Sequence, residues 1–236
     1  GRDGLLPLVA LDEVVLVYPT SVYRTWNAGA CCRRAMTHKV QDAMFISDVI
    51  NRIRTDPLVD PNLIFLAGYS NGGKMAYRVA CLYPQQITGG LIVLAGAPMA
   101  ACPPGRPLPL LQIDGTNDPD IPYSTPSPPV VQNGYTIPPL LTQVANWRAR
   151  DDCTSASTTT QVDDLTVQTW SSCADGTVVD LATYKDARHG VEIGEPGSPP
   201  SADLLYGFVQ EVEAMHKKLA AERAAESRAS SSARRR

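Results

Sequence analysis

A serine stands between glycines in residues 68–72 (GYSNG), directly after the apolar run 63–67 (LIFLA). The residues that follow, 73–80 (GKMAYRVA), are compatible with a helix. Glycines without a Cβ allow a tight turn between a strand and a helix. The pattern predicts a nucleophile elbow that exposes Ser70, with the amide of Asn71 at the helix start as one oxyanion donor. The alternative is a glycine-rich turn in which the serine is incidental.

A serine hydroxyl is a poor nucleophile at neutral pH, so it needs a base that is oriented by an acid. Behind an elbow of this kind the chain order is serine, acid, histidine. Of the three histidines, His38 precedes Ser70 and His216 lies beside two lysines. His189 follows the apolar run 178–184 and is the predicted base.

The acid is expected in a loop after a strand that lies between the serine and the histidine. The best such strand is 108–113, which runs into DGTNDPDIPY at 114–123. Asp118 lies past the strand end and is the predicted acid. Asp114 and Asp120 are its rivals, although aspartates in such loops often only cap turns.

The elements that would hold these residues alternate between strands and helices. Strands are expected at 13–18, 63–67, 87–95, 108–114, 165–170 and 178–184, and helices at 39–54, 72–83, 136–150 and 202–219. This rhythm predicts an α/β protein with a mainly parallel sheet and helices on both faces. Residues 122–139, rich in Pro, Ser and Gly, predict an irregular surface excursion. Residues 1–219 would form one domain, and 220–236 a basic tail predicted to be disordered.

The bulk composition excludes several classes of protein. Hydrophobic residues make up 44% of the 236, charged residues 19%, and the formal net charge is −3. These values suit a soluble globular chain and indicate neither a nucleic-acid partner nor a membrane partner. The oligomeric state is not indicated.

Six cysteines are present, none in a CxxC pair or with zinc-site spacing, so no metal is expected. Their even number favours disulfides and an oxidising compartment over reduced core cysteines. Six cysteines allow about 15 pairings, so the count alone leaves the connectivity open.

Three segments together resemble a known family. Residues 26–32 (WNAGACC), 68–81 (GYSNGGKMAYRVAC) and 114–123 (DGTNDPDIPY) are similar to the secreted polyhydroxybutyrate depolymerase and feruloyl esterase group of α/β-hydrolases. The resemblance covers about residues 12–208.

The resemblance implies an α/β-hydrolase fold with Ser70 as nucleophile, Asp118 as acid and His189 as base. It implies hydrolysis of a carboxylic ester through an acyl-enzyme, without metal or organic cofactor, in a secreted protein. The substrate would be a polyester or a plant cell-wall polysaccharide ester carrying feruloyl or acetyl groups. Trp26 and Asn27 would lie near the site.

Two departures from the family weaken this expectation. The His-Gly loop that supplies the other oxyanion donor has no counterpart, and residues 3–11 look like the helix that follows it. The family's first strands are therefore expected to be absent and the domain truncated at its N-terminus. Arg188 stands before His189 where the family has small residues. The alternative function is a catalytically inactive or truncated hydrolase-fold protein with a binding role or none.

For the disulfides, we expect Cys153–Cys173 to staple the segment before the last strand. Adjacent cysteines rarely bond each other. Cys31 and Cys32 are therefore expected to bond Cys81 and Cys102, in either of the two pairings.

Overall fold

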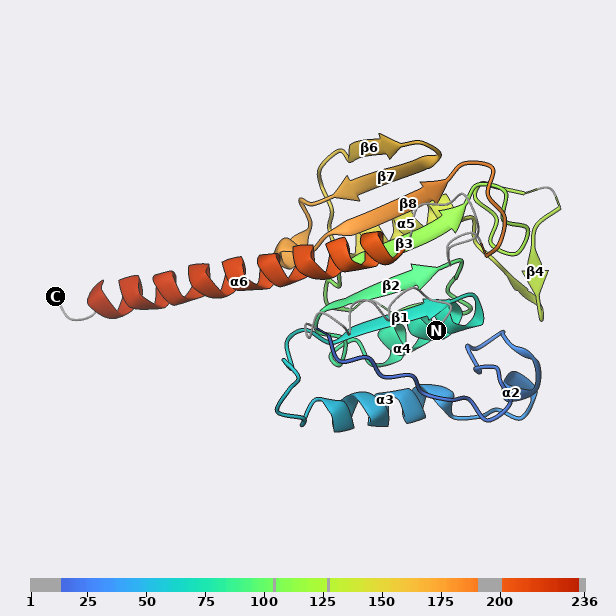
Figure 1. Ribbon diagram of the computed structural model, residues 1–236, viewed down its shortest axis with the longest axis horizontal. Helices are drawn as coiled ribbons and strands as arrows, with labels where there is room; N and C mark the ends of the chain where they lie inside the picture. The colour runs from blue at the N-terminus through green and yellow to red at the C-terminus, as the bar shows by residue number, and fades with distance from the viewer. Residues whose placement is uncertain (1–13, 104, 127, 191–200, 234–236) are drawn as a thin grey trace.

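The computed structural model describes residues 14–103, 105–126, 128–190 and 201–233. A six-stranded sheet runs through it in the order β1-β2-β3-β8-β7-β6 (Figure 1). Four strands are parallel: β1 (Phe65–Tyr69), β2 (Gly90–Leu94), β3 (Leu110–Gly115) and β8 (Val179–Tyr184). The antiparallel strands β7 (Leu165–Trp170) and β6 (Thr158–Val162) complete the far end. The predicted α/β class with a mainly parallel sheet is confirmed.

Helices cover both faces of this sheet. On one face, α3 (Asp42–Ile53), α4 (Asn71–Leu82) and α5 (Leu140–Arg150) share a core with Leu91 and Val93 of β2. On the other face, α6 (Ser201–Ala233) packs on Ile92 and Leu94. Neighbouring residues of β2 enter different cores because successive strand side chains point to opposite faces.

The remaining elements are short. Helix α2 (Arg33–Thr37) precedes α3, and the 3-10 turn η1 (Ala174–Gly176) precedes β8. Strands β4 (Val131–Gln132) and β5 (Tyr135–Thr136) form a small antiparallel hairpin inside the predicted irregular excursion. No helix among the described residues is long and apolar enough to cross a membrane.

The strand expected at 13–18 is not formed over residues 14–18, the part that the structure describes. Val15, Val17 and Tyr18 of this segment are exposed. An extended run becomes a strand only when a neighbour accepts its hydrogen bonds. In the described part of the chain, β1 is the edge strand and pairs with β2, and residues 14–18 do not extend the sheet beyond it. The expected loss of the family's first strands and the helix expected near 3–11 fall outside the described residues.

The C-terminal tail differs from the prediction. Helix α6 continues to Ala233 and reaches far beyond the sheet in Figure 1. Its first part is held by Leu205, Phe208 and Val212 in the core. Beyond residue 219 the chain is rich in Ala, Glu and Arg, which are strong helix formers, so the helix extends where a disordered tail was predicted.

The six cysteines form three disulfides. Cys153–Cys173 is confirmed, but the expected bridges from Cys31 and Cys32 to Cys81 and Cys102 are wrong. Cys81, near the end of α4, bonds Cys102 in the loop after β2, with their Cα atoms 5.1 Å apart. Since Cys81 and Cys102 are paired with each other, neither is available to Cys31 or Cys32, and these two adjacent cysteines bond each other.

Asp180 on β8 is a buried carboxyl group whose effect on stability should depend on pH. Asp180 is 5% exposed. Burial, and to a smaller extent the negative charge of Glu211, raises its pKa to about 7, although a hydrogen bond with Thr169 acts in the opposite direction. A carboxyl whose pKa is raised by folding binds its proton more tightly in the folded state. Its contribution to stability is therefore complete below about pH 4 and is lost as pH rises towards 7 and above.

We expect Asp180→Asn to raise the free energy of unfolding by about 4 kcal/mol at pH 8 and by little at pH 4. Urea unfolding at both pH values measures this. Asp163→Asn, at an exposed turn position, is the matched control. An equal effect of Asp180→Asn at both pH values would contradict the assignment.

Candidate active site

The turn between β1 and α4 presents Ser70 at the carboxyl edge of the sheet. Ser70 has φ 50°, a strained value for a residue with a side chain, and its N–H donates to Leu94 O at 2.8 Å. A Cβ on Gly68 would lie 2.3 Å from the backbone of Gly72, so this close approach needs a glycine. Strand, strained serine and helix follow one another as expected for a nucleophile elbow.

His189 joins Ser70 to Asp118. Its Nε2 lies 2.9 Å from Ser70 Oγ, and its Nδ1 lies 2.7 Å from Asp118 Oδ2. An ionised carboxylate can only accept, so Nδ1–H donates to Asp118 and Nε2 is left to accept the Ser70 hydroxyl proton. These distances fall within the range that proton transfer between a nucleophile and its base requires.

The loops that carry the acid and the base are bonded to each other. Asn117 N–H donates to Ala187 O at 2.9 Å, and Asp186 N–H donates to the Thr116 hydroxyl at 2.7 Å. The first loop follows β3 and the second follows β8, which are neighbouring parallel strands. Parallel strands end at the same edge, so residues 71 positions apart in the chain meet there.

Asp118 is held as an ionised acceptor. Burial by itself would raise its pKa, but the hydrogen bonds from His189 and from the amides of Ile121 and Asp120 outweigh it and lower the pKa below its usual value. The side chain of Asp118 is fully buried, and that of His189 is 19% exposed. The pair is therefore shielded from water, which strengthens the attraction between imidazolium and carboxylate.

The rival acids are placed differently. Asp114, at the end of β3, is buried and accepts the N–H of Gly115. Asp120 has a side chain 64% exposed and a carboxylate oxygen 3.9 Å from His189 Nε2. The structure therefore places Asp118, rather than either rival, in hydrogen-bonding contact with the histidine.

The chain was compared with known proteins to find those with a similar sequence. No family model matches the chain. Feruloyl esterase B of Piromyces equi is 27% identical over 186 residues, which are 74% of this chain and 32% of that protein. A protein named "Probable feruloyl esterase C" from Aspergillus niger is 33% identical over 84 residues, 35% of this chain and 31% of its own length. Over these segments the chain is similar to proteins named feruloyl esterases.

The similarity covers only part of each of these longer proteins. The chain spans about one third of each of these two relatives. Among solved structures, an acetyl xylan esterase from Aspergillus awamori matches 71% of this chain and 67% of its own with a TM-score of 0.44 and 11% identity.

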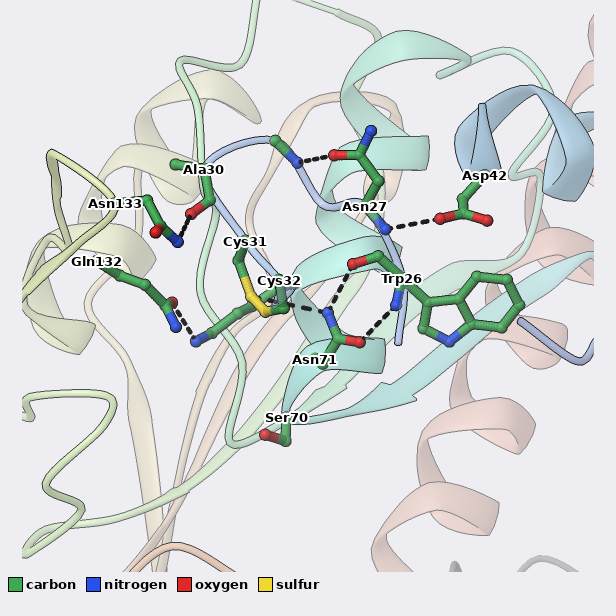
Figure 2. Close-up of a disulfide and its surroundings, with 12 residues drawn as sticks. Trp26, Asn27, Ala30, Cys31, Cys32, Asp42, Ser70, Asn71, Gln132 and Asn133 are labelled. Carbon is green, nitrogen blue, oxygen red and sulfur yellow. Dashed lines mark hydrogen bonds between the residues drawn. A yellow bond between two sulfur atoms is a disulfide. The ribbon is translucent and has the colours of Figure 1, made fainter. Parts of the chain in front are cut away.

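Asn71 opens α4, where backbone N–H groups have no partner within the helix. Its side chain locks the preceding loop in place: Asn71 Oδ1 accepts Trp26 N–H at 2.7 Å, and Nδ2 donates to Trp26 O at 3.0 Å (Figure 2). Cys31 Sγ also accepts from Nδ2. The side chain of Asn71 therefore fixes the loop, and its backbone N–H is left as the candidate oxyanion donor.

Trp26 and Asn27, predicted near the site, are used in part to build this loop. The Trp26 ring stacks on Phe45 of α3 with ring centres 6.5 Å apart. Asn27 Nδ2 donates to Val40 O, and its backbone N–H donates to Asp42. In Figure 2 both side chains point away from Ser70. A direct role in substrate binding stays a prediction.

Arg188 directly precedes His189, at a position where the resembled family has small residues, and it is exposed. Its side chain lines a shallow depression with Asp118 and Tyr123. His189 is nevertheless oriented by Asp118, so the bulky cation lies beside the hydrogen-bonded group without displacing it.

Asp118, Asp120 and His189 also carry atoms close enough to share a metal ion. Both nitrogens of His189 are already engaged by Asp118 and Ser70. A metal ion there would break the hydrogen bonds just described, so the donor set fits proton transfer better than metal binding.

Sequence reasoning missed Lys74. This lysine is buried in α4, one turn after Ser70, and bonds Gln132 of the β4–β5 hairpin. Its spacing of four residues from the serine was the available signal, because residues at i and i+4 share one helix face.

Proposed function

We propose that residues 1–219 form the catalytic domain of a serine-dependent carboxylic ester hydrolase. The observation that carries the proposal is the continuous set of hydrogen bonds Ser70–His189–Asp118 at the elbow. The relationship to feruloyl esterases supports the same reaction class.

The reaction proceeds in two halves. Ser70 Oγ attacks the ester carbonyl carbon while His189 Nε2 takes the hydroxyl proton, and Asp118 stabilises the imidazolium. The amide of Asn71 donates to the oxygen that becomes negative. His189 then gives the proton to the leaving alcohol, which departs from the acyl-enzyme. Water attacks the acyl carbon with His189 again as base, the acid is released and Ser70 regains its proton.

The substrate we propose is a feruloyl ester of a plant cell-wall polysaccharide, since the relatives are named feruloyl esterases. Acetyl and polyhydroxyalkanoate esters share the mechanism and differ only in the group that must fit. Three disulfides support an extracellular location, because disulfides persist in oxidising compartments.

Substrate profiling tests the proposal. Methyl ferulate, p-nitrophenyl acetate, acetylated xylan and polyhydroxybutyrate are offered to the folded chain, and a fluorophosphonate probe is used to label it. We expect hydrolysis of the feruloyl ester and a single label on the peptide that contains Ser70. A folded chain that neither hydrolyses any ester nor takes the label would favour the inactive hydrolase-fold alternative.

A further inference from the structure

Lys74 is a buried cation beside the proposed nucleophile. It is 5% exposed, and its Nζ donates to Gln132 Oε1 at 2.9 Å. The ion pairs found among the described residues do not include it. Buried lysines are rare unless a carboxylate pairs with them, so a lysine held by a neutral amide needs an explanation.

Two aspartates of the acid loop interact electrostatically with Lys74. Burial lowers the pKa of Lys74, and the negative charges of Asp120 and Asp118 act in the opposite direction. Lys74 follows Ser70 by one helical turn, and helical side chains lean towards the helix N-terminus. The ammonium group is therefore directed towards the N-terminal end of α4, close enough to the acid loop for the charges of Asp120 and Asp118 to act on it.

The hairpin that Lys74 holds has a second tether. Asn133, in the turn of the hairpin, donates from Nδ2 to Ala30 O at 2.8 Å. Ala30 belongs to the loop that Asn71 fixes through Trp26. Figure 2 shows both tethers on the same side of the elbow as the Cys31–Cys32 disulfide.

The segment around the hairpin spans the site. It leaves the acid loop at Pro122 and Tyr123, whose carbonyls accept the first N–H groups of α5, where the segment ends. Between these points the hairpin reaches across to Ala30. In the sheet order, His189 follows β8 and lies on the β3 side of Ser70, whereas α2, which begins three residues after Ala30, lies on the β1 side (Figure 1). His189 must reach the leaving alcohol, so the acyl group is expected on the side of Ser70 away from β8, where the hairpin meets Ala30.

We propose that Lys74 is a specificity-determining residue that, through Gln132, holds the β4–β5 hairpin as a fixed wall limiting the length of the acyl group. This proposal rests on the proposed ester hydrolysis. Lys74 acts through the hairpin, so it positions the wall and takes no part in proton transfer.

Two esters that share one leaving group test the proposal. The ratio of kcat/KM for p-nitrophenyl octanoate to that for p-nitrophenyl acetate is measured in Lys74→Met and in Gln132→Met. We expect the ratio to rise about tenfold in both, mainly through a lower KM for the octanoate, because contacts in an apolar pocket discriminate by amounts of this order. Lys218→Met, at an exposed position on α6, should leave it unchanged.

A compensating variant separates tethering from simple loss of structure. Gln132→Glu replaces the amide with a carboxylate 2.9 Å from the ammonium and should keep the wild-type ratio. If Lys74→Met does not fold, Gln132→Met carries the same test, since Gln132 is only half-buried on the hairpin. Unchanged ratios in a folded tether variant would overturn the proposal.

Hydrogen exchange of the amides of residues 130–136 gives a readout that needs no activity. We expect exchange to be faster in Lys74→Met and Gln132→Met, and unchanged in Lys218→Met. Faster exchange with an unchanged ratio would overturn the specificity role. If the wild-type chain has no esterase activity, the proposed function is wrong. If hydrogen exchange is also unchanged in Lys74→Met and Gln132→Met, Lys74 does not hold the hairpin either.

Discussion

Replacing Ser70 by alanine is expected to lower ester hydrolysis by about 10⁶-fold, to the background rate, because removal of the nucleophile from a working triad costs about this much. The Ser70 hydroxyl is the group within 2.9 Å of His189 Nε2, so no acyl-enzyme forms without it. The hydrolysis of p-nitrophenyl acetate and the extent of fluorophosphonate labelling measure the effect.

The matched control for this variant is Ser171→Ala, at an exposed serine after β7. It should leave both readouts unchanged. Labelling or hydrolysis that persists in a folded Ser70→Ala chain would show that another group carries the reaction.

Replacing Asp118 by asparagine is expected to lower kcat by about 10⁴-fold with the fold intact. Asn has nearly the same shape, but its amide N–H₂ can donate to Nδ1 of His189, which favours the tautomer whose Nε2 carries the proton. Nε2 could then no longer accept the Ser70 proton. Steady-state kinetics on p-nitrophenyl acetate, together with a thermal unfolding curve, measures this.

Two further variants sharpen the test of the acid. Asp120→Asn examines the rival carboxylate, which is exposed and 3.9 Å from Nε2, and should cost far less than Asp118→Asn. Asp152→Asn, at an exposed position with φ 51° that asparagine tolerates, is the neutral control. An equal or larger loss in Asp120→Asn would assign the acid to that residue.

The candidate site illustrates how far local pattern reaches. The elbow was visible in the sequence because its parts are contiguous: an apolar run, glycines around Ser70 and a helix-compatible segment. His189 follows from chain order and elimination among three histidines, whereas Asp118 is preferred by its place after a strand and by the family resemblance, with Asp114 and Asp120 as rivals. The structure brings the three side chains within hydrogen-bonding distance, and their catalytic roles stay a proposal that the two variants above test.

Errors arose where the outcome depends on distant partners. Residues 14–18 are apolar enough for a strand, yet they do not pair with β1 at the edge of the described sheet. The cysteine pairing depends on the loop after β2 meeting the end of α4. The end of α6 differs from the predicted disordered tail for a local reason, because residues 220–233 combine many charges with a high helix propensity.

The sequence by itself determined the alternation of strands and helices, the parallel sheet and the chemistry available at positions 70, 118 and 189. These features depend on periodicity, backbone freedom and residue type, which act within a few neighbouring residues. Only the tertiary structure decided which cysteines bond, which aspartate contacts the histidine, and that Lys74 holds a hairpin 58 residues away. Such contacts join segments far apart in the chain, and their geometry is set by how the helices and loops pack on the sheet.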